Sequence, residues 1–99
     1  MIDLASIKGL EWDAGNGRKN QDKHDVSQGE AEQVFLNDPL VLMQDSTHSQ
    51  EEPRFHALGQ TDDGRRLLIA FTLRQSQTLI RVISARDMNR RERSLYDTA

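Results

Sequence analysis

The amino-acid sequence predicts one α+β domain over residues 1–99, with an antiparallel sheet, two N-terminal helices and a C-terminal helix. Three observations lead to this fold class. Four short apolar runs between residues 40 and 85 are separated by polar turns, as in a meander of strands. Signals for helix starts occur before and after these runs. A chain of 99 residues is also long enough for one hydrophobic core and too short for two.

The N-terminal part is expected to begin with a short strand. Residues 10–12 follow Ile7, and we expect the Trp12 side chain to pack in the core. Residues 14–24 are almost free of apolar side chains and include two glycines, so intrinsic propensity makes them a poor helix.

A second helix is predicted over Val26–Leu36 with much stronger support. Ser27 and Glu30 have the spacing of a capping box. Three apolar residues then follow at helical spacing, namely Ala31, Val34 and Phe35. The helix is expected to end at Asn37-Asp38-Pro39, because the residue before a proline disfavours helical backbone.

The remaining elements are four strands and a last helix. The predicted strands are Leu40–Met43, Arg54–Leu58, Leu67–Thr72 and Leu79–Ala85. The sequence Thr61-Asp62-Asp63-Gly64 predicts a hairpin turn. The run 67–72 is continuously apolar, which is typical of a central strand buried on both faces. Asp87 is expected to cap a final helix over Met88–Tyr96.

Composition and charge exclude several classes of protein. The chain has no cysteine, which removes disulfides, thiolate metal sites and cysteine nucleophiles, and it has no Gly-rich phosphate loop or Gly-x-Ser-x-Gly motif. His48 and His56 lack the spacing of a metal site. No apolar run approaches about 20 residues, and Met1–Leu10 does not resemble a secretory signal, so a cytoplasmic protein without membrane contact or cofactor is expected.

The net charge of −3 hides an asymmetry between the two parts of the chain. Residues 1–64 have a net charge of −8, whereas residues 65–99 carry eight arginines against three acids, a net of +5. Guanidinium groups suit phosphate contacts, because they bind phosphate oxygens in bidentate fashion. A basic segment that pairs with the acidic half of the same fold remains an equal alternative.

Two charged residues stand at positions predicted to be apolar. Arg81 shares a strand face with Leu79 and Ile83, and Glu92 falls on the stripe of the last helix with apolar neighbours. A buried charge is tolerated mainly when it is paired. We therefore expect an ion pair between Glu92 and an arginine such as Arg81 or Arg54; the alternative is that arginines line a pocket and Glu92 orients them.

Arg86, Arg90 and Arg93 have the spacing of one basic helix face, which either is solvated or binds phosphate. His24 follows Lys23, and a neighbouring cation favours neutral imidazole. A lone histidine of this kind is more often structural than catalytic.

Fragments along residues 10–97 together resemble the BrnT family of bacterial type II toxins. The residues that carry the resemblance run from Glu11-Trp12-Asp13 through Asn20, Lys23-His24, Val26-Ser27, Glu30-Ala31, Val34-Phe35, Asp45, His48, Glu52, Arg54 and Gly59 to the segment 80–86, Glu92 and Tyr96. The resemblance implies a compact RelE-like fold and makes residues 14–24 a helix. Three positions depart from the family pattern. Asp25 stands where a glycine is usual but tolerates left-handed backbone. Gln28-Gly29 replaces the usual aromatic and acidic residues, and the glycine should weaken the second helix by roughly 1 kcal/mol.

The resemblance further implies a metal-independent ribonuclease toxin that cleaves RNA and inhibits translation. Its expected partners are RNA and a BrnA-like ribbon-helix-helix antitoxin that neutralises the toxin, with DNA contacted only through the antitoxin. In this interpretation Arg54, Arg81 and Arg86 form a charge clamp around the phosphate. Lys23 or His24 would transfer protons, and Glu52 would act as a base or fix an arginine. Arg74, Arg90 and Arg93 would bind RNA, and Trp12, Glu92 and Tyr96 would be structural.

Two other functions stay open. One is a toxin-fold binding module that has weak or no catalysis and serves as a partner subunit or regulator. The other is a domain that contacts DNA through Arg86, Arg90 and Arg93. Salt dependence of binding would reveal nucleic-acid contacts, and RNA cleavage would separate an enzyme from an adaptor.

Overall fold

The computed structural model describes residues 6–12, 24–45, 53–74 and 78–99. In chain order these residues form β1 (Gly9–Trp12), α2 (Gln28–Leu36), β2 (Val41–Gln44), β3 (Phe55–Gln60), β4 (Arg66–Arg74), β5 (Leu79–Asp87) and α3 (Arg90–Asp97). The α+β class is therefore confirmed. The first predicted helix, apart from its last residue His24, lies outside the described residues.

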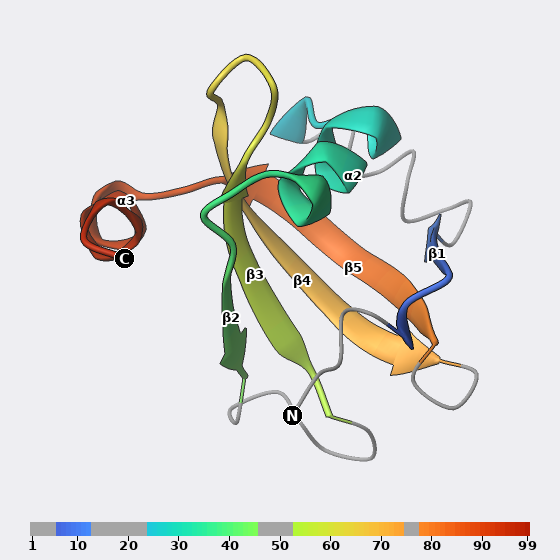
Figure 1. The fold of residues 1–99 in the computed structure, drawn as a ribbon. Helices are drawn as coiled ribbons and strands as arrows, with labels where there is room; N and C mark the ends of the chain where they lie inside the picture. The colour runs from blue at the N-terminus through green and yellow to red at the C-terminus, as the bar shows by residue number, and fades with distance from the viewer. Residues whose placement is uncertain (1–5, 13–23, 46–52, 75–77) are drawn as a thin grey trace.

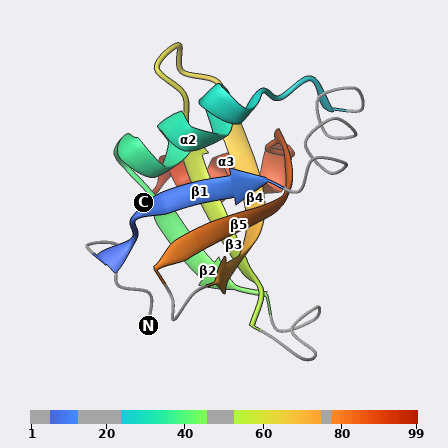
Figure 2. The same ribbon diagram turned by 90° about the vertical axis from the view of Figure 1, so that its right-hand side faces the viewer.

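The five strands form one mixed sheet with the order β1-β5-β4-β3-β2. The strands from β2 to β5 pair antiparallel in chain order, as the hairpin signals predict. β1 instead pairs parallel with β5, with Gly9 opposite Leu79 and Trp12 opposite Val82. The prediction of a purely antiparallel sheet is thus wrong, because β1 fills the free edge of a strand far away in the sequence (Figure 2).

Local turn and cap signals are confirmed in detail. Gly64 has a φ of 86°, and the Thr61 N–H donates to the Arg65 carbonyl at 2.9 Å, which closes the β3–β4 hairpin. Ser27 caps α2, and its hydroxyl accepts from the Glu30 N–H at 3.1 Å. Asp25 has a φ of 54°, so it adopts the left-handed backbone predicted for it.

The two helices pack on opposite sides of the sheet (Figure 1). The larger core lies between the sheet and α2, and Phe71 of the central strand β4 is fully buried in it. Phe71 contacts Phe35 edge-on and stacks on Phe55, with ring centroids 5.3 and 5.6 Å apart. Trp12 is partly buried against this core. A smaller core on the other side holds Leu58, Leu68, Met88 and Tyr96.

The last helix begins later than predicted. Asp87 is the final residue of β5 and pairs with Leu67, so it does not cap the helix. Asn89 is the cap instead, because its side chain accepts from the Glu92 N–H at 2.8 Å while the Glu92 carboxylate accepts from the Asn89 N–H. Tyr96 is the residue that anchors α3: it is buried, and its hydroxyl donates to the Pro39 carbonyl at 2.6 Å.

Two glycines give opposite predictions for the same substitution. A Cβ on Gly59 would stand 2.7 Å from Val34 Cγ1 and 3.1 Å from the Val34 carbonyl oxygen, so Gly59→Ala should push α2 off the sheet and destabilise the protein by about 1–3 kcal/mol. A Cβ on Gly29 meets nothing closer than 3.9 Å, and Gly29→Ala should stabilise α2 by up to roughly 1 kcal/mol. Urea unfolding of both variants checks this. Equal effects of the two substitutions would contradict the close helix–sheet contact.

Candidate active site

The side of the sheet that faces α3 carries the functional residues predicted on β5. Side chains on neighbouring strands share a face when their residues are paired. Arg81 is opposite Thr72, Ser84 is opposite Ala70, and Arg86 is opposite Leu68. Because residues 68, 70 and 72 alternate along β4, all three β5 side chains lie on one side of the sheet. We call this side the arginine face and define it by His56, Ala70, Thr72, Arg81, Ser84 and Arg86.

A β-bulge explains how Arg81 and Arg86 come to the same face. In a regular strand two residues five positions apart point to opposite sides. The pairing of β4 with β5 is shifted between Ala70 and Phe71, so that Val82 and Ser84 oppose consecutive residues and Ile83 is the extra residue. This bulge reverses the alternation, and it is the local feature that aligns the two arginines.

The arginine face is arranged in rows across the strands. His56 pairs with Ala70, which in turn pairs with Ser84, so these three residues form a middle row. Arg81 lies one row to one side and Arg86 one row to the other, each about 6.5–7 Å away along the strand. The small side chains of Ala70 and Ser84 leave the middle row lower than its arginine neighbours. Within the described residues, α3 is the one helix on this side, and it covers the end at Leu58 and Leu68.

Arg86 is held by Glu92 of α3. Its two terminal nitrogens donate to the two carboxylate oxygens at 2.7 and 2.8 Å. These bonds lower the pKa of Glu92, with a further contribution from the Asn89 N–H, and they raise the pKa of Arg86. The predicted ion pair of Glu92 therefore exists, but its partner is Arg86 and not Arg81 or Arg54, because Arg86 stands on the row nearest α3.

Arg81 has a weaker carboxylate neighbour. Its Nε lies 3.7 Å from Glu11 Oε1, and both side chains are more than a third exposed. Exposed pairs of this kind contribute little to stability.

Arg54 and Arg74 stand at the ends of the central strands. Arg54 directly precedes β3, and its carbonyl accepts from the Asp45 N–H at 2.7 Å, which continues the β2–β3 ladder by one residue. Strand alternation therefore places Arg54 on the arginine face, two residues from His56. Arg74 is the last residue of β4 and is opposite Leu79. The arginines predicted to form the clamp thus share one face, although Arg81 and Arg86 have different carboxylate partners in this structure.

An aspartate–histidine pair on the same face was not predicted. His56 Nε2 lies 3.2 Å from Oδ2 of Asp45, whose side chain is only 7% exposed. The charge of His56 also contributes to the lowered pKa of Glu92, so the imidazole is close enough to α3 to interact with it. The sequence alone led us to consider His56 only as a metal ligand. Its position two residues after Arg54 on a predicted strand could have indicated that both side chains lie on one face.

Three residues were predicted to transfer protons, and the structure describes one of them, His24. Lys23 and Glu52 lie outside the described residues. His24 lies at a junction on the α2 side, where Arg65 Nη2 donates to its carbonyl at 3.2 Å. Asp87, whose pKa is lowered chiefly by Arg65 and in part by the charge of His24, belongs to the same junction. The structure therefore does not bring His24 to the middle row of the arginine face.

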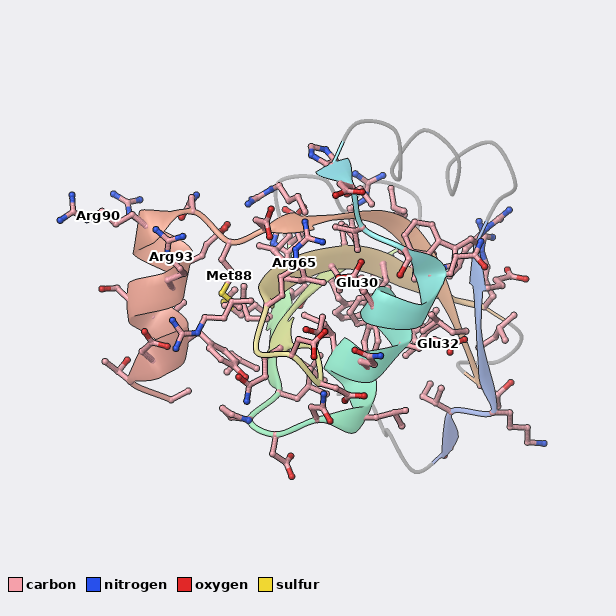
Figure 3. The ribbon with its side chains drawn as sticks, turned by 90° about the horizontal axis from the view of Figure 1, so that it is seen from above. Glu30, Glu32, Arg65, Met88, Arg90 and Arg93 are labelled. Atoms are coloured by element: carbon pink, nitrogen blue, oxygen red, sulfur yellow. The ribbon has the colours of Figure 1, made fainter. Side chains whose placement is uncertain are left out.

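Arg65 was missed by the sequence analysis and is the centre of this junction. It donates to Asp87 at 2.7 and 3.1 Å, to Glu30 at 3.1 Å and to the backbone carbonyls of Asp25 and His24. Figure 3 shows Arg65 beside Glu30. One guanidinium thus joins the start of β4, the end of β5 and the segment that leads into α2. The hydrogen bonds that Arg65 donates to Asp87 and Glu30 raise its pKa.

The predicted basic helix face is not formed as expected. Arg86 belongs to β5, so helical spacing does not relate it to Arg90 and Arg93. Both of those arginines are exposed on α3, and Figure 3 shows Arg90 pointing away from the sheet. Leu95 on the predicted apolar stripe is half exposed. α3 therefore contacts the sheet side through few residues.

Searches for other kinds of site gave negative findings for the described part of the chain. No group of three or more possible metal ligands occurs among those residues. No helix within the described ranges is long and apolar enough to cross a membrane.

The carboxylates of these clusters predict loss of stability in acid. Glu30 and Glu92 have ordinary pKa values of 4.5 and Asp87 of 3.8, and all three are lowered in the folded protein. Groups of this sign stabilise the fold fully above their unfolded pKa and lose that contribution as the pH falls through the folded pKa. The free energy of unfolding, measured in urea, should therefore fall as the pH falls below about 4.5. Glu92→Gln should reduce that slope, and an unchanged slope would contradict the assignment.

Comparisons with known proteins agree with this description. A protein family described as "Ribonuclease toxin, BrnT, of type II toxin-antitoxin system" matches residues 12–92. Among solved structures, the fold is similar to the Brucella abortus ribonuclease toxin BrnT, with 18% identity and a TM-score of 0.64 over 83% of this chain and 97% of that chain. None of the curated proteins searched matches the chain.

The fold and the family match together define a ribonuclease toxin. The chain belongs to the BrnT family of type II toxin–antitoxin systems, which confirms the resemblance seen in the sequence. Membership makes it an enzyme of the ribonuclease class and implies an antitoxin partner.

Proposed function

We propose that this chain cleaves RNA on the arginine face, inhibits translation in the cytoplasm and is neutralised by a BrnA-like ribbon-helix-helix antitoxin. The observation that carries the proposal is the bulge that brings Arg81 and Arg86 to one side of the sheet, on either side of the low row formed by Ala70 and Ser84. A phosphodiester above this row would lie within reach of guanidinium groups from two directions.

The chemistry proposed for this face does not require a metal. RNA is cut when the ribose 2′-hydroxyl attacks the adjacent phosphorus, and negative charge then grows on the phosphate oxygens. Preorganised cations stabilise that charge, and removal of one such donor typically costs about 10²–10³-fold in rate. Arg54, Arg81 and Arg86 are the proposed clamp. Arg74, Arg90 and Arg93 are proposed to bind flanking RNA, and Lys23, His24 and Glu52 stay predictions for proton transfer.

The experiment that tests the proposal uses RNA with altered ribose. Purified protein should cleave an oligoribonucleotide and leave the same sequence intact when every ribose carries a 2′-O-methyl group. The products should end in a 2′,3′-cyclic phosphate and a 5′-hydroxyl. Cleavage of the methylated strand would contradict the proposed reaction. Expression should arrest growth, and coexpression of a ribbon-helix-helix antitoxin should restore it.

One observation favours the alternative of a binding module without catalysis. The Glu92 carboxylate already occupies the two terminal nitrogens of Arg86 that would bind a phosphate. If that pair is permanent, the face binds a partner but lacks one of the three arginines of its clamp. Absence of RNA cleavage by folded wild-type protein would support this alternative.

A further inference from the structure

We propose that His56 is the general base of RNA cleavage and that Asp45 is its positioning residue. The inference deepens the proposed function, on which it rests, and assigns a role to two residues of the arginine face that the clamp does not use. It depends on three observations, namely the Asp45–His56 contact, the place of His56 in the middle row, and the charges around the imidazole.

The contact with Asp45 fixes the orientation of the imidazole. Asp45 Oδ2 is 3.2 Å from His56 Nε2, and the Asp45 side chain is nearly buried whereas that of His56 is 30% exposed. A buried carboxylate that accepts the proton of one ring nitrogen leaves the other nitrogen as the acceptor. We therefore assign the proton to Nε2, on the side of Asp45, and infer that Nδ1 is the nitrogen that takes a proton from substrate.

The place of His56 in the sheet puts its imidazole on the same face as the clamp. His56 is opposite Ala70, which is opposite Ser84, so the imidazole shares the row between the rows of Arg81 and Arg86. Adjacent strands are about 4.8 Å apart, so Ser84 lies about 10 Å from His56 across the sheet. A phosphate and its ribose fill this span, with the guanidinium groups on the phosphate and the imidazole beside the 2′-hydroxyl.

Two carboxylates interact with His56. Asp45, which follows β2, lies 3.2 Å from the imidazole, and Glu92 of α3 has its pKa lowered in part by the charge of His56. Arg54 precedes β3 on the same face, and β4 places the uncharged Ala70 opposite His56. Both carboxylates stabilise an imidazolium after it has taken a proton. Glu92 thus interacts with two groups on this face: it pairs with Arg86, and the charge of His56 lowers the pKa of Glu92.

The reaction step balances without any further reactant except water. The 2′-hydroxyl gives its proton to His56 Nδ1 as its oxygen forms a bond to phosphorus. The bond between phosphorus and the 5′-oxygen breaks, and the 5′-oxygen takes a proton from water. The products are a 2′,3′-cyclic phosphate and a 5′-hydroxyl, and the imidazolium then loses its proton to solvent.

The test measures cleavage of an oligoribonucleotide by wild type, His56→Gln, His56→Ala and Asp45→Asn between pH 5 and pH 9. General-base catalysis typically contributes about 10²–10⁴-fold, so both His56 variants should lose at least 100-fold at neutral pH. The wild-type rate should fall in acid as imidazole becomes protonated, and the His56 variants should lack this acid limb. Added imidazole should restore part of the activity of His56→Ala. Asp45→Asn should lower kcat more than it changes KM, because the imidazole loses the carboxylate that orients it.

Controls separate this role from a structural one. Circular dichroism must show folded protein for each variant, and Glu32→Gln, an exposed carboxylate on α2 across the sheet, should retain the wild-type rate and pH profile. A His56→Gln variant that cleaves RNA at the wild-type rate with the wild-type pH profile would overturn the inference and leave the proposed function intact. Folded wild type that cleaves no RNA at any pH would overturn both.

Discussion

Arg81→Ala is expected to lower the rate of RNA cleavage by about 100- to 1,000-fold while the protein remains folded. Arg81 stands on the open part of the arginine face, and its pairing with Glu11 at 3.7 Å is loose. The substitution removes charge from the proposed phosphate site, and loss of the exposed pair with Glu11 costs the fold at most about 1 kcal/mol. Cleavage of an oligoribonucleotide and thermal unfolding of the same sample measure the two effects separately.

The matched control is Arg91→Ala. Arg91 is exposed on α3 and has no proposed role in the clamp, so the variant loses the same charge at a different place. It should cleave RNA at nearly the wild-type rate. Equal activity of folded Arg81→Ala and wild type would remove Arg81 from the site. Arg86→Ala does not separate activity from stability as well, because it also leaves the carboxylate of Glu92 without its partner. That carboxylate is only 17% exposed, so the variant is expected to lose stability.

Arg65→Ala is expected to produce a large loss of stability, about 2–4 kcal/mol. The substitution removes a guanidinium that bonds two carboxylates and two backbone carbonyls, and hydrogen bonds to charged groups contribute roughly 1.5–3 kcal/mol each in favourable cases. The expected loss of stability is smaller than the summed energies of these hydrogen bonds, because Asp87 is 60% exposed and stays solvated when its bond is lost. Urea unfolding at neutral pH measures the change.

The neighbouring residue supplies the control for this prediction. Arg66 contacts Asp97 at 3.2 Å, with both side chains more than 40% exposed, so Arg66→Ala should cost less than about 1 kcal/mol. The two variants remove the same side chain from adjacent positions. A loss for Arg65→Ala as small as that for Arg66→Ala would mean that the junction does not stabilise the fold.

Elements with local signals could be predicted from the sequence. The capping box of Ser27 and Glu30, the turn at Gly64 and the left-handed Asp25 all depend on neighbours within a few residues. The apolar run of β4 likewise identified the central strand, because it is buried on both faces.

Features that depend on distant residues could not be predicted in the same way. The parallel pairing of β1 with β5 and the bonds of Arg65 join segments far apart along the chain. Among these features, the bulge at Ile83 has the largest effect on where the predicted site residues lie. Simple alternation separates Arg81 from Arg86, whereas the shifted pairing places both on one face. The partner of Glu92 was missed for the same reason, since alternation alone did not direct Arg86 toward α3.

The central claim is that RNA binds and is cleaved on the arginine face. The most direct test titrates isotope-labelled protein with a 2′-O-methyl oligoribonucleotide, which binds without being cut, and follows backbone amide shifts by NMR. We predict the largest changes along the β4 and β5 segments that carry Thr72, Arg81 and Ser84, and at His56, with α2 unaffected. Changes centred on α2 and β1, with none on these residues, would contradict the account.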